Sequence, residues 1–512
     1  MVPQKHGLKA YVNNTSPFPM GRVLGGTSVL NSLEYVRGNR RDYDNWEAMG
    51  NPGWRYKDVL KYFKKAEDYR GTRNVDTAEY HGRGGPLKVE DKRYSAPVTS
   101  GFLKAGQQLG YSIIDPSGPE QIGFSIPETT TQDGRRVSTA EAYVKPAATA
   151  LNLHVAFNAH VTQVLFDDNR QAAGVRFEQR GQVRTVLARR EVVVSAGAVG
   201  SPKLLMLSGV GPSQHLQEHH IPVVVDLPGV GQNFHDHAIV NGLTWSVNKG
   251  SATSGLLLTS PTAFKDFVHD GQGPLTSSFG LEANAWTVTE EEEDPGWPDL
   301  QYTLSSLSLP IDHGVVSTRG YGLRKDLYHQ YFKGLLGQEG ITICPSLTRP
   351  KSRGSVKLRS RDFRDPPLID PNYLSHPDDV TTLVRGIEFA LKVANTTALR
   401  DDHGAKFHDQ VLPGCERWWD VAGWDSYWAC YVRHMTTSFY HPAGSCKMGP
   451  ASDLLTVVDH TLRVRGVAGL RVVDASIMPL VVSGNINAAV IMIGEKGADL
   501  IKQDWGATVD PL

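Results

Sequence analysis

The chain has 512 residues, 40% of them hydrophobic, so it can bury a large core and form roughly two to four domains. Its 53 basic and 54 acidic residues leave a formal net charge of -1 at pH 7, which gives no overall field to attract nucleic acid or an anionic membrane. No apolar run approaches the ~20 residues that cross a bilayer, so we expect no membrane span. The composition favours a small, roughly neutral ligand.

Glycines and helical periodicity mark the first part of the chain. Residues 21–31 (GRVLGGTSVLN) form a glycine-rich loop that leads into an apolar segment. Apolar spacing predicts helices over 57–69 and 98–109, and a turn into a short strand over 84–89. Glycines let backbone N–H groups approach an anionic ligand because no Cβ intervenes, although a structural turn explains them equally well.

From residue 154 to residue 196 the pattern changes to a period of two. Three short alternating runs, separated by DDNR and RGQ, predict a β-meander. A buried strand over 192–194 follows, then a turn of small residues and a helix from Pro202. This order of elements is typical of a nucleotide-binding sheet.

The second half of the chain is less informative. Residues 239–348 lack a clear period and carry no motif that we can interpret, whereas 355–358 resemble a strand and 379–394 a helix. The four cysteines, Cys344, Cys415, Cys430 and Cys446, are too few for a disulfide scaffold and lack the spacing of metal ligands. We therefore predict no metal site, and a single bridge between Cys415 and Cys430 stays open.

Several segments share the wording of one family. They are GRVLGGTSVLNSLEYVRGNRRDYDNW (21–46), DGRRVSTAEAYVKPA (133–147), VSAGAVGSPKLLMLSGVGP (194–212), GVGQNFHDH (229–237), YHPAGSCKMGP (440–450) and VVDASIMPLVVSGNINAAVIMIGEKGADLI (472–501). Together they resemble the glucose-methanol-choline (GMC) oxidoreductases over residues 15–502, most of all the insect glucose dehydrogenase-like branch.

The resemblance implies a mixed α/β and α+β fold, in which a partial, Rossmann-like FAD-binding domain is interwoven with a substrate domain on an antiparallel sheet. It places the FAD-binding region at 1–238, a substrate-domain region at 239–349 and a C-terminal region with the catalytic residues at 350–502. The implied partners are an alcohol or sugar substrate and a quinone-like electron acceptor or oxygen. The implied enzyme is an FAD-dependent dehydrogenase or oxidase acting on CH–OH groups by hydride transfer to flavin N5.

The family's two catalytic positions correspond to His441 and Asn485. Imidazole, with an ordinary pKa of about 6.5, suits the removal of a hydroxyl proton, so we predict that His441 is the base. An amide cannot be the base, but Asn485 can hydrogen-bond the substrate oxygen and orient it.

The resemblance also implies the contacts with FAD. The expected cofactor-binding residues are Gly21, Arg22, Gly25, Gly26, Thr27, Asn31, Val161, Ala196, Gly197, Asp474, Ala475, Asn485, Ile486 and Asn487. Family members that attach flavin covalently through this loop carry histidine where this chain has Leu30, and leucine has no nucleophilic atom. FAD is therefore expected to bind non-covalently.

Members of the family begin with a strand, a G-x-G-x-x-G turn and a helix, a unit of about 30 residues. The 20 residues before Gly21 contain no such turn, so we expect this segment, and a secretion signal with it, to be missing from the printed chain. An extracellular location is expected from the resemblance alone. Two alternatives stay open: a catalytically silent GMC-fold protein that has lost FAD binding, and a lyase on the same scaffold.

Overall fold

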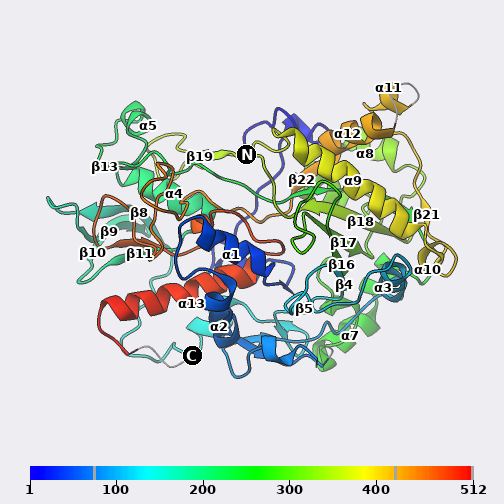
Figure 1. Cartoon of the computed structure of the whole chain (residues 1–512), viewed down its shortest axis with the longest axis horizontal. Helices are drawn as coiled ribbons and strands as arrows, with labels where there is room; N and C mark the ends of the chain where they lie inside the picture. The colour runs from blue at the N-terminus through cyan, green and yellow to red at the C-terminus, as the bar shows by residue number, and fades with distance from the viewer. Residues whose placement is uncertain (73–75, 420–423, 509–512) are drawn as a thin grey trace.

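The computed structural model describes residues 1–72, 76–419 and 424–508. Two hydrophobic cores lie side by side in it (Figure 1). One core surrounds a large β-sheet, at the right of the view, and the helix α9 (Pro377–Ala394). The other surrounds two parallel strands, β11 (Val192–Val194) and β23 (Leu470–Val472), and the helix α13 (Asn487–Asp504). We call these the large-sheet half and the parallel-strand half.

The large-sheet half contains an eight-stranded sheet in which all paired strands are antiparallel. The order along its main path is β21-β15-β18-β17-β16-β4, and β14 pairs with both β18 and β22. The strands are β4 (Gly123–Ser125), β14 (Ala238–Val240), β15 (Thr244–Ser246), β16 (Leu281–Thr287), β17 (Leu300–Ser305), β18 (Gly340–Leu347), β21 (Lys406–Phe407) and β22 (Thr436–Ser438). They come from distant segments, so the two halves are interwoven along the chain.

One face of this sheet is apolar and is covered by α9. Gly386 of α9 packs closely against Leu300, since a Cβ at Gly386 would lie 3.1 Å from that side chain. The rings of Phe389 and Tyr302 are 5.0 Å apart between centroids. Residues two apart on a strand share a face, so Leu300 and Tyr302 mark the side of the sheet that faces the apolar core.

The opposite face is polar and points toward the parallel-strand half. Gln301 and Thr303 alternate with the apolar residues of β17, and Asn284 on β16 lies directly opposite Thr303. The side-chain amide of Gln301 donates to Oδ1 of Asn485, which lies just before α13. This polar face is therefore the boundary between the two halves.

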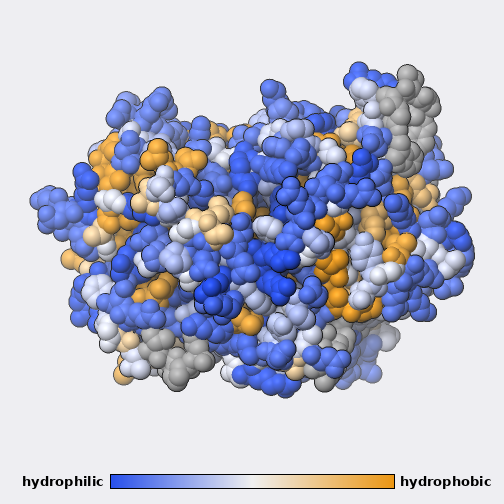
Figure 2. All heavy atoms as spheres, in the orientation of Figure 1, coloured by the Kyte–Doolittle hydropathy of each residue, from blue (hydrophilic) through white to orange (hydrophobic). Residues whose placement is uncertain are grey.

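The parallel-strand half has the strand and helix order of a nucleotide-binding sheet. The strand β11 pairs in parallel with β23 and leads into α4 (Gly197–Leu207). Beside them lies an antiparallel meander of β8 (Ala159–Phe166), β9 (Ala172–Gln179) and β10 (Gln182–Leu187), in the order β10-β9-β8. Figure 2 shows a mainly hydrophilic surface, with apolar patches at the left of the view, where the parallel-strand half lies.

Shorter elements surround the two cores. The remaining helices are α1 (Arg40–Ala48), α2 (Tyr56–Ala66), α3 (Val98–Gln108), α5 (Ser213–Glu218), α6 (Gly255–Leu258), α7 (Pro261–Asp270), α8 (Lys325–Tyr331), α10 (Thr397–Arg400), α11 (Glu416–Trp419) and α12 (Trp424–Met435). The remaining strands pair as β1 (Glu34–Tyr35) with β5 (Glu128–Thr129), β2 (Glu67–Tyr69) with β3 (Leu87–Val89), β6 (Thr131–Gln132) with β7 (Arg135–Arg136), β12 (Val210–Gly211) with β13 (Val225–Asp226), and β19 (Ser355–Lys357) with β20 (Leu368–Asp370).

Most of the predicted elements are confirmed, with small shifts at their ends. The helices over 57–69, 98–109 and 379–394 are α2, α3 and α9, and the meander is β8 to β10. The strand over 192–194 is β11. The fold has the predicted mixed α/β and α+β character. Within the described parts of the chain, no helix is both long and apolar enough to cross a membrane.

One prediction is wrong: the helix expected from Pro202 begins five residues earlier, at Gly197. Proline has no N–H, so Pro202 cannot donate to the carbonyl of Ala198 one turn before it. The hydroxyl of Ser445 donates to that carbonyl at 2.5 Å instead. The helix runs through Pro202 because a residue of a distant segment supplies the missing donor.

Candidate active site

His441 lies just after β22, and its side chain is 8% exposed. Its backbone N–H donates to Oδ1 of Asp236 at 2.7 Å. The other oxygen of Asp236 accepts from the hydroxyl of Ser438 at 2.5 Å and from that of Tyr373. Burial raises the pKa of Asp236 to about 6, and these hydrogen bonds act in the opposite direction. Asp236 thus holds the backbone that carries His441.

The ring of His441 is oriented by His237. Their Nδ1 atoms are 2.9 Å apart, and Nε2 of His237 is 2.9 Å from the carbonyl oxygen of Thr348. A carbonyl only accepts, so Nε2 of His237 carries the proton and its Nδ1 accepts from Nδ1–H of His441. This hydrogen-bond chain assigns the free lone pair of His441 to Nε2.

Both rings are buried, and both are held in the neutral form. Burial lowers the pKa of His237 to about 4, although the carbonyl groups of Thr348 and Val482 act in the opposite direction. Burial, with the neighbouring His237, also holds the pKa of His441 well below its ordinary value. At neutral pH His441 therefore presents an unprotonated Nε2.

Asn485 is a polar partner of that nitrogen. Its Nδ2 lies 3.4 Å from Nε2 of His441, and its Oδ1 accepts from Nε2 of Gln301 at 3.2 Å. Gln301 thereby orients the side-chain amide of Asn485 so that its NH₂ group faces His441. The structure brings the two predicted catalytic residues together, on a loop and a strand end 44 residues apart.

The loop that carries Asn485 is anchored on both sides. The backbone N–H of Val481 donates to Nε2 of His235 at 2.9 Å. The backbone N–H and the hydroxyl of Ser483 donate to Asp42 at 2.6 and 2.7 Å. These contacts fix the backbone on the N-terminal side of Asn485, and the helix α13 begins two residues after it.

Six predicted cofactor residues lie in one loop: Gly21, Arg22, Gly25, Gly26, Thr27 and Asn31. The guanidinium of Arg136 donates to Oδ1 of Asn31 at 2.7 Å and to its carbonyl oxygen at 2.8 Å. Arg22 lies 3.1 Å from Nδ1 of His160, on β8. The loop is therefore held in place by the protein and lies beside the edge of the meander, which also carries Val161.

A second group lies where β11 and β23 end: Ala196, Gly197, Asp474 and Ala475. Asp474 accepts from the backbone N–H of Gly197 at 2.9 Å, from the hydroxyl of Ser201 at 2.5 Å and from the backbone N–H of Ser476 at 2.8 Å. Because the two strands are parallel, their carboxyl ends meet at this edge, which is where nucleotides bind in such sheets. The other predicted residues, Ile486 and Asn487, lie half-buried at the start of α13.

These groups fit FAD. Gly197 has a φ of +79°, and apart from its chain neighbours and the adjacent backbone of α4 no described protein atom lies within 4 Å of the position a Cβ would take, so its backbone is open to a ligand. The apolar side chains of Val23, Leu24, Val29 and Leu30 are exposed on the 21–31 loop, where a flavin would cover them. A cavity of about 550 Å³ lies beside the loop; Leu24, Val29 and Phe157 line it, but His441 and Asn485 do not.

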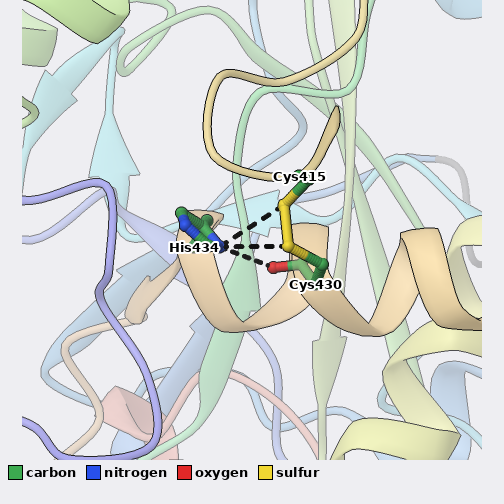
Figure 3. A group of neighbouring side chains, drawn as sticks. All are labelled: Cys415, Cys430 and His434. Atoms are coloured by element: carbon green, nitrogen blue, oxygen red, sulfur yellow. Dashed lines mark hydrogen bonds between the residues drawn. A yellow bond between two sulfur atoms is a disulfide. The ribbon is translucent and has the colours of Figure 1, made fainter. Parts of the chain in front are cut away.

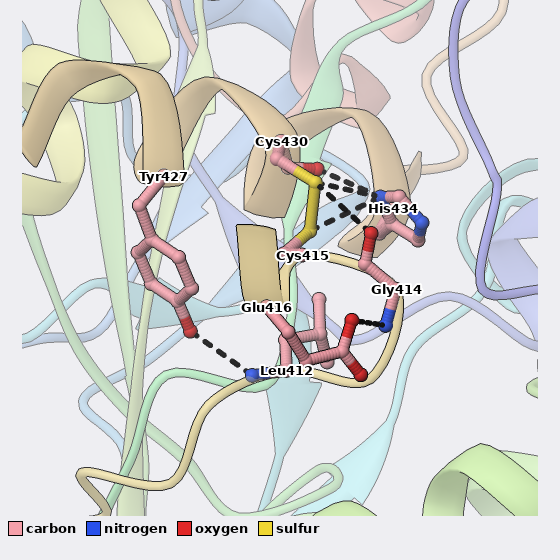
Figure 4. The surroundings of a disulfide bond; sticks show 7 residues. All are labelled: Leu412, Gly414, Cys415, Glu416, Tyr427, Cys430 and His434. Atoms are coloured by element: carbon pink, nitrogen blue, oxygen red, sulfur yellow. Dashed lines mark hydrogen bonds between the residues drawn. A yellow bond between two sulfur atoms is a disulfide. The ribbon is translucent and has the colours of Figure 1, made fainter. Parts of the chain in front are cut away.

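The cysteine pair that the sequence left open is a disulfide between Cys415 and Cys430 (Figure 3). His434 lies beside it, with Nδ1 3.5 and 3.6 Å from the two sulfur atoms. The three residues are close enough to surround an ion, but the sulfur atoms are bonded to each other and Nδ1 donates to the carbonyl of Cys430 at 2.9 Å. Figure 4 shows that the bridge joins the segment before α11 to α12.

Comparison with known proteins agrees with this geometry. The chain matches the GMC oxidoreductase family over residues 3–239 and again over 350–494. It is 42% identical to "Glucose dehydrogenase [FAD, quinone]" of Drosophila melanogaster over 96% of this chain and 76% of that protein. It is 37% identical to "Choline dehydrogenase, mitochondrial" of Homo sapiens over 95% of this chain and 76% of that protein.

A solved structure, pyridoxine 4-oxidase from Mesorbium loti, superposes with a TM-score of 0.79 at 25% identity, covering 98% of this chain and 88% of that one. The fold and the site define an FAD-dependent oxidoreductase that acts on alcohols. The chain belongs to the GMC oxidoreductase family.

Sequence reasoning assigned no role to several residues that hold this site. His235, Asp236 and His237 each contact the catalytic segments, yet the motif GVGQNFHDH was used only as a family marker. Gln301 lies in the region where we found no motif. For His235, Asp236 and His237 the sequence does offer one signal: two histidines flank an aspartate in a segment that is otherwise rich in small residues.

Proposed function

We propose that this protein oxidises the CH–OH group of an alcohol, and of a sugar in particular, with His441 as the base and with FAD bound non-covalently. Asn485 orients the substrate oxygen. The absence of a nucleophilic atom at Leu30 supports the non-covalent attachment. The name of the fruit-fly relative, a glucose dehydrogenase that uses FAD and a quinone, supports a sugar substrate and a quinone-like acceptor, and oxygen is the alternative acceptor.

The state of His441 carries this proposal. Nε2 is unprotonated at neutral pH, faces the N–H side of the Asn485 amide and lies in a buried site where little water competes. FAD, when bound, supplies the acceptor for the hydride that leaves the substrate carbon as His441 takes the hydroxyl proton. His441 is left protonated, and His237 can accept its Nδ1–H throughout.

The test compares two variants of the FAD-loaded protein in an anaerobic stopped-flow experiment. His441→Ala removes the proton acceptor, and we expect flavin reduction by the substrate to slow by roughly 10²- to 10⁴-fold. Asn485→Ala removes a hydrogen bond to an uncharged partner, and we expect a loss of about 3- to 10-fold. FAD content and the unfolding midpoint of each variant serve as controls.

Two results would contradict the proposal. If His441→Ala reduced the flavin within a few-fold of the parent, another group would be the base. If Asn485→Ala were the more damaging variant at every pH, the two roles would have to be exchanged. Flavin that stays oxidised with every alcohol would favour the lyase, and a protein that holds no flavin would favour the silent relative.

A further inference from the structure

Three side chains on the polar face of the large sheet are buried without using their full hydrogen-bonding capacity. They are Asn284, Gln301 and Thr303, each at most 2% exposed. Oε1 of Gln301 and Oγ1 of Thr303 make no hydrogen bond with the described protein groups, and the two amide atoms of Asn284 make none of ordinary geometry, although this amide lies against the carboxyl group of Glu34. Asn284 lies directly opposite Thr303, so these atoms occupy neighbouring positions on adjacent strands.

The same cluster reaches the catalytic residues. Gln301 donates to Asn485, whose amide faces His441. The carboxyl group of Glu34 lies next to the amides of Asn284 and Asn485, and its Oε2 has no hydrogen bond of ordinary geometry. Burial raises the pKa of Glu34 to about 7, with the amide of Asn284, the positive charge of Lys92 and the amide of Asn485 acting in the opposite direction. We call Glu34, Asn284, Gln301 and Thr303 the polar shelf.

Buried polar atoms nearly always have a partner, because leaving one unpaired costs the free energy of removing it from water. Four side chains that share this feature, gathered beside a catalytic base, therefore point to a ligand that completes their hydrogen bonds.

We infer that the polar shelf binds the non-reacting hydroxyl groups of a polyhydroxylated substrate, a sugar or a polyol, while His441 and Asn485 hold the hydroxyl that is oxidised. The inference rests on the function proposed above for His441.

The chemistry of the shelf selects this class of substrate. An asparagine amide offers two donors and an acceptor, a glutamine oxygen accepts, and a threonine hydroxyl does both. A substrate hydroxyl is both donor and acceptor, so neighbouring hydroxyls on a sugar ring match this mixture. A cationic alcohol such as choline would need an ionised or aromatic cage, whereas Glu34 is the acidic member of the shelf and is partly neutral at pH 7.

The test uses two substrates that share the reacting group. D-Glucose and tetrahydropyran-2-ol both carry a cyclic hemiacetal hydroxyl, but the second lacks every other hydroxyl. In the FAD-loaded protein we expect Asn284→Leu to lower kcat/KM for glucose by about 10- to 100-fold and for tetrahydropyran-2-ol by less than about 3-fold. The affinity for 1,5-anhydro-D-glucitol, measured from the change in flavin absorbance on binding, should fall together with kcat/KM for glucose.

Thr342→Val is the matched control. Thr342 is also a buried threonine whose hydroxyl has no partner among the described residues, but it lies on β18, two strands away from Asn284. It should leave the ratio of the two substrates unchanged. If Asn284→Leu lowered kcat/KM equally for both substrates, the inference would be overturned. It would also be overturned if the parent enzyme had a higher kcat/KM for choline or tetrahydropyran-2-ol than for glucose and glycerol. Failure of all alcohols to reduce the flavin would instead contradict the proposed function.

Discussion

The two sides of the site satisfy their polar groups in opposite ways. On the cofactor side, Asp474 accepts three hydrogen bonds from the protein itself, and Arg136 donates to Oδ1 and to the backbone carbonyl oxygen of Asn31. On the substrate side, the amide atoms of Asn284 and Oε2 of Glu34 are buried next to each other without a hydrogen bond of ordinary geometry. The carboxylate of Asp474 and Oδ1 of Asn31 thus have protein partners, whereas most groups of the polar shelf do not; on the cofactor side the buried hydroxyl of Ser476 is the exception among the residues described above, since it makes no hydrogen bond of ordinary geometry.

This difference indicates two modes of recognition. A cofactor that is the same in every turnover can be held by open backbone and by a preformed loop, as at Gly197. A substrate that must be distinguished from other alcohols needs side chains whose hydrogen bonds are completed by its own hydroxyls. The second mode makes the free protein less stable, because the unpaired groups remain buried while no substrate is bound.

The largest effect is expected from Glu34→Gln on the pH dependence of stability. A carboxyl whose folded pKa is about 7, against 4.5 for its ordinary value, binds more protons in the folded state than in the unfolded state between these pH values. The parent should therefore lose up to about 3 kcal/mol of stability as the pH rises from 4.5 to 8, and the variant should lack this loss. Chemical denaturation at several pH values measures it.

Glu282→Gln provides the control for that measurement. Glu282 is fully buried, but its carboxylate is paired with Lys92 at 2.7 Å and accepts from Ser306 at 2.6 Å. Neutralising it should destabilise the protein at pH 8, because the buried ammonium group of Lys92 would lose this carboxylate as its ion-pair partner. If Glu34→Gln destabilised the protein at pH 8 to the same extent, Glu34 would be a satisfied structural carboxylate and the comparison between the two sides would fail.

The next largest effect concerns His237, the link between the large sheet and the base. His237→Leu removes the acceptor for Nδ1–H of His441, and residues that orient a functional histidine typically contribute about 10- to 100-fold. We expect that loss in the rate of flavin reduction. The pH below which reduction slows should move upward, because His237 helps to lower the pKa of His441. His237→Gln, which can still accept, should restore part of the rate; a variant with the parent's rate and pH profile would remove His237 from the mechanism.

The loops expected to hold the cofactor carry sequence motifs, and the polar shelf carries none. Backbone recognition requires glycines and short turns at fixed places, as at Gly25, Gly26 and Gly197, and such constraints leave motifs. Asn284 and Gln301 instead alternate with apolar residues in the way that solvent-facing strand residues do. Their burial results from coverage by the other half of the chain. The contact of His237 with His441 spans 204 residues, and no local pattern encodes it.

The smallest effect is expected on the cofactor side, from Gly197→Ala. Its φ of +79° costs a non-glycine residue about 1 kcal/mol, and the new Cβ would point into space that the protein leaves open. Gly110→Ala is a matched control, since Gly110 has a φ of +88° and equally open surroundings at the end of α3. Both variants should lose similar stability, but Gly197→Ala alone should weaken FAD binding, which fluorescence titration measures. The preference for glucose over tetrahydropyran-2-ol should not change in either variant, because the polar shelf is intact. A change in that preference with Gly197→Ala would mean that the two sides of the site are coupled.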